Sequence, residues 1–349
     1  MTGTKLCASV VDVFCGAGGL SFGFQQEGFE IVAGVDVDEA CRHPYTANVG
    51  APFLRRDVAS LSADEVGDLF LDDRPRVLVG CAPCQPFSTY NQKNADPNWQ
   101  LLEHFANLIV ATEPDVVSME NVPRLLNFRG GSVFRSFVEK LRAADYTPVF
   151  DILYGPDFGL AQTRSRLVLL AAKNGSPKLP MPTHVGKHRT VEEEIGKLPK
   201  LEAGQRDRED RLHCASSLSD TNRKRIRASK PGGTWRDWPE NLIAECHRDD
   251  RGRGYSAVYG RMEAGKPSPT VTTQFYGFGN GRFGHPTQDR ALSLREGAML
   301  QGFPRDYSFV PDDEDVSFTR VGRLIGNAVP VPLARAIARS VRSHLGNRL

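Results

Sequence analysis

Val10-Val11-Asp12-Val13-Phe14-Cys15-Gly16-Ala17-Gly18-Gly19-Leu20 is the stretch from which the fold can first be predicted. Its apolar half is typical of a buried strand, and a helix is expected from Gly18 to Glu27. A glycine-rich turn between a strand and a helix lets the backbone approach a ligand closely at the head of the helix. Such units occur in many nucleotide-binding folds, so this stretch alone leaves the cofactor open.

The same alternation of short apolar runs and amphipathic stretches continues to about residue 175. Strands that alternate with helices predict an α/β fold with a doubly wound, mostly parallel sheet. Asp36 ends the second expected strand, where a carboxylate typically holds ribose hydroxyls, although a solvated strand end would look the same. The further strands are expected at residues 31–35, 76–80, 116–119 and 166–172, and helices at 101–111, 133–144, 293–301 and 333–345.

Composition changes near residue 175. Residues 174–183 are rich in Pro and Gly, as a linker would be, and residues 189–261 are polar and rich in arginine. Trp235 and Trp238 are expected in the core of this smaller region rather than on its surface. We predict a first domain over residues 1–180, a smaller second domain over 181–285, and a C-terminal segment over 286–349 that returns to the first domain.

The bulk properties of the chain exclude few functions. It has 349 residues and a formal net charge of +2, which fits a DNA enzyme with one basic groove and many metabolic enzymes equally well. No apolar run approaches the ~20 residues of a membrane span, and residues 1–9 are too polar for a signal peptide, so we expect a cytoplasmic protein. Seven irregularly spaced cysteines argue against a disulfide framework.

A second motif, Gly80-Cys81-Ala82-Pro83-Cys84-Gln85-Pro86-Phe87-Ser88, follows the third expected strand. Cys84 therefore belongs to a loop at the carboxyl end of a parallel strand, where open α/β sheets place their sites. Cys81 and Cys84 also form a C-x-x-C pair, which raises a zinc or redox interpretation. Zinc would need a second pair of ligands. His213-Cys214 and Cys246-His247 fit no standard spacing, so we expect no metal.

Two further motifs follow the same logic. Glu120-Asn121-Val122-Pro123 ends the fourth strand, so its carboxylate would face the cleft of Cys84, unless the motif is only a helix-capping turn. Gln162-Thr163-Arg164-Ser165-Arg166 leads into the fifth strand. Its alternate arginines would project to one side of an extended segment and suit an anion, but taken alone they also fit a solvated edge strand.

In their order along the chain, these motifs resemble those of the C5-cytosine DNA methyltransferase family. Arg295-Glu296-Gly297-Ala298-Met299-Leu300-Gln301-Gly302-Phe303-Pro304 and Gly326-Asn327-Ala328-Val329-Pro330 look like the late motifs of that family. The resemblance covers about residues 10 to 340. It implies a Rossmann-like S-adenosylmethionine-dependent methyltransferase with a smaller target-recognition domain, which transfers methyl to C5 of a cytosine flipped out of duplex DNA.

The resemblance also implies roles for individual residues. Cys84 matches the nucleophile that adds to C6 of cytosine, and Glu120 matches the carboxylate on the N3 side of the base. Arg166 matches a residue that supports the flipped base, and Arg164 a neighbour in the cleft. The residues that match cofactor contacts to S-adenosyl-L-methionine are Phe14, Gly16, Gly18, Leu20, Asp36, Asp57, Pro83 and Asn327.

DNA contacts are expected from two places. The segment 89–100 would close over the DNA, and the polar region between the fifth strand and the Arg295 helix occupies the position of target recognition. Its arginines would bind phosphates or read guanine edges. The residues predicted to contact DNA are Ser88, Arg223, Arg225 and Arg227.

The sequence also departs from the family pattern. Asn98-Trp99 stand where an arginine is common, and Gly297 replaces a common alanine although glycine inside a helix costs up to ~1 kcal/mol. Two alternatives remain: an RNA cytosine-5 methyltransferase of the same superfamily, and a catalytically silent DNA-binding subunit. The resemblance implies a prokaryotic restriction-modification or defence setting, with duplex DNA as substrate, a separate cognate nuclease as partner, and action as a monomer.

Overall fold

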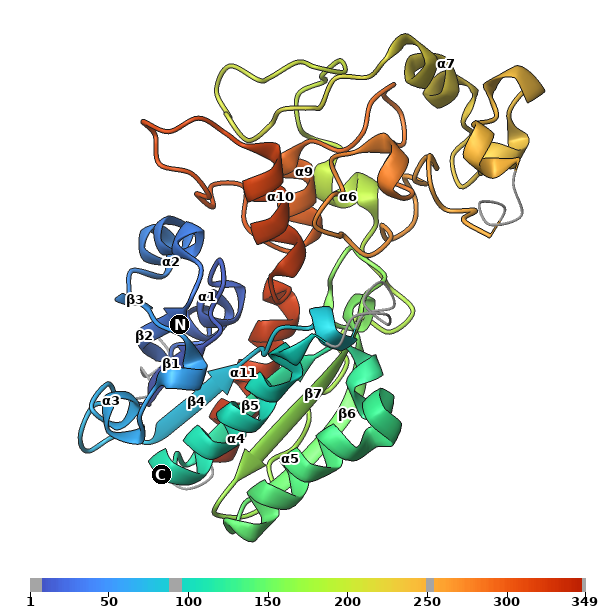
Figure 1. Cartoon of the computed structure of the whole chain (residues 1–349). Coiled ribbons are helices and arrows are strands. Elements are labelled where there is room, and N and C mark those ends of the chain that lie inside the picture. Colours follow the sequence, from blue (N-terminus) through green and yellow to red (C-terminus); the bar gives the residue numbers. More distant parts are fainter. Residues whose placement is uncertain (1–7, 88–95, 249–253, 347–349) are drawn as a thin grey trace. The chain divides into compact units, whose positions relative to one another are not determined.

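A computed structural model describes residues 8–87, 96–248 and 254–346 of the chain (Figure 1). The chain divides into two compact units. The first unit comprises residues 1–158, 165–183 and 328–349, and the second comprises 159–164 and 184–327. Residues 286–327 thus group with the second unit, and only 328–349 return to the first. Which function belongs to each unit stays a prediction.

The first unit is built on a mostly parallel sheet. Within the described residues its strands have the order β3-β2-β1-β4-β5-β7-β6. β1 to β5 run parallel, whereas β7 is antiparallel to both of its neighbours. The α/β fold with a mostly parallel sheet is therefore confirmed. The strands are β1 Ser9–Val13, β2 Glu30–Asp36, β3 Phe53–Arg55, β4 Arg76–Gly80, β5 Val116–Asn121, β6 Thr147–Tyr154 and β7 Ser165–Ala172.

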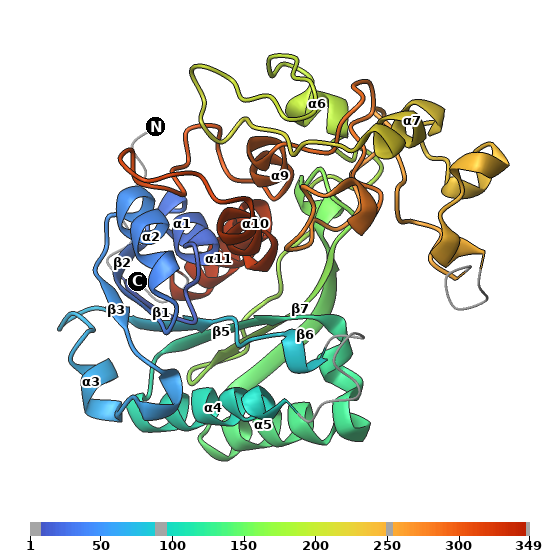
Figure 2. The same ribbon diagram turned by 45° about the horizontal axis from the view of Figure 1, so that its top comes forward.

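Helices cover both faces of this sheet, with α4 and α5 on one face and α1 and α11 on the other (Figure 2). The alternation of side chains along a strand decides which residue meets which layer. Val11 and Leu78 pack toward α4 and α5, whereas Val10 and Val79 pack toward α1 and α11. The helices of this unit are α1 Gly19–Gln26, α2 Arg42–Val49, α3 Ala63–Gly67, α4 Leu101–Thr112, α5 Ser132–Ala143 and α11 Val331–Gly346.

Two strands were not anticipated from the sequence. β3 is short, and β6 lies at the edge of the sheet. In β6, Phe150, Ile152 and Tyr154 are partly exposed, at 40%, 44% and 37%. Because apolar side chains thus lie on the exposed face as well, the sequence of β6 lacks the alternation of apolar and polar residues that predicts a strand.

The second unit has few regular elements, and buried polar contacts stabilise it beside its apolar core. Arg290 is fully buried and binds both carboxylate oxygens of Glu296, at 2.6 and 2.7 Å. Trp235 and Trp238 pack with Phe278 in a small hydrophobic core, as expected. The α-helices of this unit are α6 Val191–Ile195, α7 Asp220–Ala228, α9 Leu294–Leu300 and α10 Phe318–Asn327. Among the described residues, no helix has both the length and the apolar character that a membrane span requires.

Candidate active site

The candidate site of the first unit lies where the parallel strands end. β1, β2, β4 and β5 end at Val13, Asp36, Gly80 and Asn121, all at the same edge of the sheet. The loops after these strands carry the motifs singled out in the sequence. An open α/β sheet binds its ligands at this edge.

Glu120 is the most constrained side chain of this site. It lies in β5 and is 2% exposed. The thiol of Cys81 donates to Oε2 of Glu120 over 2.9 Å, and Nε of Arg166 lies 3.0 Å from Oε1. Burial, followed by the charge of Glu120, raises the pKa of Cys81 well above its usual value, so Cys81 stays a thiol and can donate. Oε2 thus accepts a hydrogen bond from Cys81, and Oε1 forms an ion pair with Arg166.

Cys84 lies on the loop after β4, and its side chain is partly buried against the core that faces α4. Asn121, which ends β5 beside Glu120, is 1% exposed and donates from Nδ2 to the carbonyl of Ala82 over 3.0 Å. A buried side-chain amide needs such a hydrogen-bond partner, because it has no access to water. The bond ties the loop that carries Cys84 to the strand that carries Glu120.

The glycine-rich turn after β1 is tied to the end of β2. The backbone N–H of Gly16 donates to Oδ2 of Asp36 over 2.9 Å, and that of Asp38 donates to Oδ1 over 2.9 Å. Burial raises the pKa of Asp36, and the two N–H donors oppose that rise. Gly16 has φ +52, and a Cβ atom there would meet nothing within 4 Å. The turn therefore leaves open space next to a carboxylate at the N-terminus of α1.

Comparison with known proteins decides the family. The family model for C-5 cytosine-specific DNA methylases matches residues 8–343. The chain belongs to this family. The enzyme class is accordingly DNA (cytosine-5)-methyltransferase.

Two relatives agree with this assignment, and a solved structure has a similar fold. The methylase is 47% identical to the type II methylase M.HgiDII of Herpetosiphon aurantiacus, over 97% of this chain and 96% of the relative. It is 32% identical to the type II methyltransferase M1.HphI of Haemophilus parahaemolyticus, over 95% and 86% of the two chains. A prophage-encoded DNA modification methyltransferase of E. coli has a similar fold, with a TM-score of 0.75 at 22% identity over 97% and 99% of the chains.

Several cofactor residues predicted from the sequence lie in the first unit of the methylase. Phe14 and Gly18 both have positive φ, at 65° and 90°, so the turn is left-handed on either side of Gly16. Leu20 is buried in α1, and Pro83 is partly buried. Asp57 is exposed and accepts from the backbone N–H of Ala59 over 2.9 Å, where it caps a short 3-10 helix. Their contacts with a cofactor stay predictions.

Arg164 and Asn327 belong to the second unit, unlike Arg166. Arg164 is 5% exposed, and its guanidinium donates to the carbonyls of Val271 and Gly326, over 3.1 and 3.3 Å. Arg164 thus holds the end of α10, where the exposed Asn327 lies.

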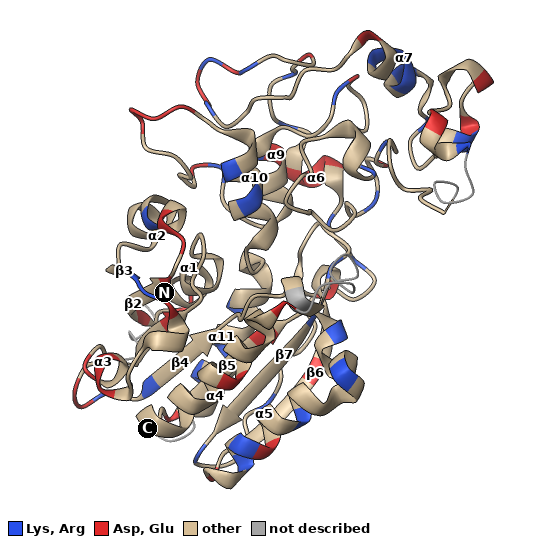
Figure 3. Cartoon of the chain, viewed as in Figure 1, with Lys and Arg blue, Asp and Glu red and all other residues tan. Residues whose placement is uncertain are grey.

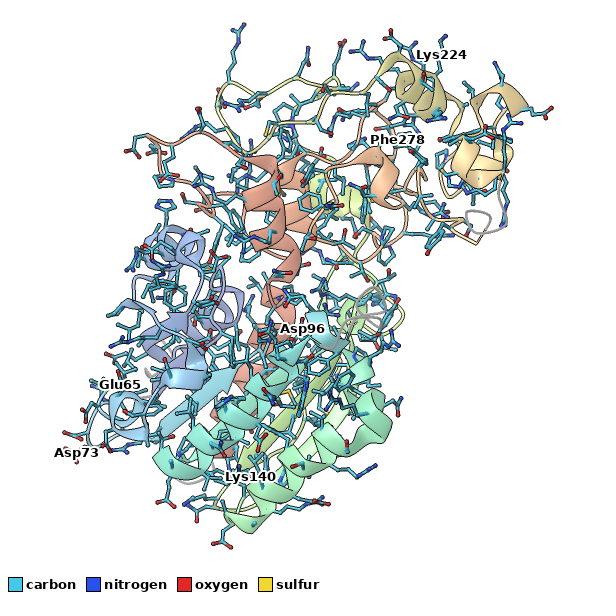
Figure 4. All side chains as sticks on the ribbon, in the orientation of Figure 1. Glu65, Asp73, Asp96, Lys140, Lys224 and Phe278 are labelled. Atoms are coloured by element: carbon cyan, nitrogen blue, oxygen red, sulfur yellow. The ribbon has the colours of Figure 1, made fainter. Side chains whose placement is uncertain are left out.

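The arginines predicted to contact DNA differ in their surroundings on α7. Arg225 donates to the carbonyl of Leu242 over 2.8 Å and lies 5.6 Å from the ring of Trp238, so it is packed into the unit. Arg223 and Arg227 are exposed, and Arg227 forms an ion pair with Asp289 at 3.4 Å. Lys224 is also exposed on this helix (Figure 4).

The loop predicted to close over DNA is described only in part. Ser88 and residues 89–95 lie outside the described residues.

One buried group was missed by the sequence reading. Asp12 is fully buried in β1 and accepts from the hydroxyl of Ser21 over 2.6 Å. That hydroxyl lies 3.0 Å from the hydroxyl of Tyr45. Burial raises the pKa of Asp12 to about 7, although the hydrogen bond from Ser21 acts to lower it. The signal in the sequence was a lone acid within an apolar strand.

Proposed function

We propose that the methylase flips a cytosine out of duplex DNA and methylates its C5, with Cys84 as a covalent nucleophile and S-adenosylmethionine as the methyl donor. One observation carries this proposal. A buried carboxylate, Glu120, is held by Cys81 and Arg166 on the strand that Asn121 ties to the loop of Cys84. A nucleophile and a fixed carboxylate on adjacent strand ends are what addition to a pyrimidine ring requires.

The chemistry follows from the reactivity of cytosine, whose C5 is a poor nucleophile in the intact aromatic ring. When the thiolate of Cys84 adds to C6, a new S–C6 bond forms and the electrons of the C5–C6 double bond become available at C5. Glu120 would act as the general acid on the N3 side of the base and stabilise the charge that develops there during attack. After methyl transfer to C5, a base removes the C5 proton, the S–C6 bond breaks, and the double bond returns.

The cofactor proposal rests on the turn that follows β1. S-adenosylmethionine is a sulfonium cation, and it supplies an electrophilic methyl group. The open turn at Gly16 leaves room for close backbone approach, and the carboxylate of Asp36 is fixed beside it to accept hydrogen bonds from ribose hydroxyls. These residues fit an adenosine-containing cation.

The biological setting is also a proposal. Two relatives with at least 30% identity are named a type II methylase and a type II methyltransferase. We infer that this methylase protects host DNA from a separate cognate nuclease, and that it acts as a monomer.

Trapping with duplex DNA that contains 5-fluorocytosine tests the proposal, because fluorine at C5 cannot leave as the proton does. The unsubstituted enzyme should form an adduct stable to denaturant when S-adenosylmethionine is present. The Cys84→Ser variant should form none but still bind the duplex. A catalytically silent subunit would give no adduct in either case, and an RNA methyltransferase would be trapped by 5-fluorocytosine RNA instead.

A further inference from the structure

Three exposed arginines lie on the segment that leaves the candidate active site. The 3-10 helix η6, Pro123–Gly131, follows β5 almost directly, and α5 follows η6. Arg124 and Arg129 lie on η6, and Arg135 lies in the first turns of α5. We call these three residues the η6 arginine surface. Figure 3 marks Lys and Arg positions in blue along the ribbon of α5.

Among the described residues, the η6 arginine surface has no carboxylate partner. All three side chains are exposed, and none of them forms an ion pair with a described Asp or Glu. The residues of the first unit that the structure does not describe contain no Asp or Glu either, because 1–7, 88–95 and 347–349 lack both residue types. Three positive charges next to the site therefore remain available to an external anion.

This lack of partners is not general in the first unit. Arg335 and Arg339 on α11 both bind Oε1 of Glu27, at 2.8 and 2.9 Å. Arg56 lies 3.3 Å from Glu65. Arg56, Arg335 and Arg339 are thus paired with a carboxylate of their own unit, unlike the arginines of the η6 surface. The exposed Arg142 and Arg342 form no ion pair with a described Asp or Glu either.

The centre of the surface is also held in place. The guanidinium of Arg129 lies 4.2 Å from the ring centroid of Trp99, and the ring of Phe128 lies 5.0 Å from that of Phe87. In the sequence, Phe87 precedes residues 88–95 and Trp99 follows them. The adjacent residues Phe128 and Arg129 of η6 therefore contact one residue on each side of that segment. Stacking restrains a planar guanidinium but leaves its N–H edges free to bind an anion.

We propose that the η6 arginine surface binds the phosphate backbone of the target duplex beside the flipped cytosine. The inference rests on the proposed function and adds a contact surface on the unit that carries Cys84. A guanidinium matches a phosphate with two parallel hydrogen bonds. Such contacts fix the position of a protein on DNA without reading its sequence.

The test is the salt dependence of DNA binding. A short duplex of mixed sequence is titrated with the full-length protein at several salt concentrations, and fluorescence anisotropy gives Kd. The slope of log K against log salt is negative, and each phosphate contact that is removed should reduce its magnitude by about 0.9. Arg129→Gln should therefore weaken binding and flatten the slope, and a variant with Arg124, Arg129 and Arg135 all changed to Gln should flatten it further.

A matched control has the same loss of charge elsewhere in the unit. Arg335→Gln and Arg339→Gln each remove one of the two arginines that bind Glu27, so their slopes should equal that of the unsubstituted protein. Arg129→Lys keeps the charge and should keep the slope while it loses part of the affinity. Circular dichroism shows whether each variant is folded.

A slope for the triple variant equal to that of the Arg335 control would overturn the inference. The trapping experiment separates this failure from that of the proposed function. If the unsubstituted protein forms a covalent adduct but the slope does not change, only the surface is wrong. If the protein binds structured RNA through these arginines and does not bind the duplex, both are wrong.

Discussion

Asp12→Asn should change how the stability of the methylase depends on pH. Asp12 is fully buried below the glycine-rich turn, and the groups that face it are the hydroxyl of Ser21 and the charge of Asp36, with Tyr45 bonded to Ser21. Its pKa is about 7 in the folded chain, against about 3.9 in an unfolded chain. Between these two values the folded chain binds more protons than the unfolded chain, so stability falls as pH rises.

The size of the effect follows from the two pKa values. The difference between the folded and unfolded pKa values of Asp12 corresponds to about 4 kcal/mol in the free energy of unfolding. The change in that free energy from pH 5 to pH 8 is about 3 kcal/mol. An asparagine does not titrate, and its carbonyl oxygen can still accept from Ser21. The unsubstituted protein should therefore lose about 3 kcal/mol relative to Asp12→Asn across this range.

Urea denaturation at pH 5, 6, 7 and 8, followed by fluorescence, measures this difference. Asp73→Asn is the control, because Asp73 is exposed and has a φ of 60° that asparagine tolerates (Figure 4). The control should keep the pH dependence of the unsubstituted protein. A difference between Asp12→Asn and the unsubstituted protein that stays constant with pH would refute the reasoning.

Two further predictions concern the active site and the second unit. Cys81→Ala removes the donor to Oε2 of Glu120. It should lower kcat about fivefold, equivalent to about 1 kcal/mol. KM should change little, and Cys81→Ser should restore kcat because its hydroxyl can donate in place of the thiol. Equal kcat values for the Ala and Ser variants would show that the hydrogen bond to Glu120 is unimportant. Gly297→Ala would place a Cβ atom 2.0 Å from Cε2 of Phe275, which is fully buried. It should destabilise the protein by about 1–3 kcal/mol in a thermal melt despite the better helix propensity of alanine, and a higher Tm would contradict this.

The fold was predictable where apolar runs are buried on both faces of the sheet. β1, β4 and the apolar part of β7 were predicted correctly because central strands that are buried on both faces are nearly continuous apolar runs. β6 was missed because it is an edge strand whose side chains are mostly exposed. The antiparallel direction of β7 depends on its pairing with β5, which no local pattern encodes.

The candidate site was predictable in its residues but not in its contacts. Strand ends placed Cys84 and Glu120 at one edge of the sheet, whereas the bond from Cys81 to Glu120 depends on side-chain packing between two strands. The charge of an arginine run likewise does not reveal burial, since Arg225 packs beside Trp238 while Arg227 is exposed. Gly297 looked unfavourable in a helix, and only the position of Phe275 explains it.

Bisulfite sequencing of DNA from cells that express the methylase, beside cells that express Cys84→Ser, tests the central claim most directly. The account predicts methylcytosine at one short recurring sequence with the unsubstituted protein and none with the variant. Methylation at the same sequence with Cys84→Ser would contradict the role of Cys84. No methylcytosine in either sample would contradict DNA methylation by this chain alone.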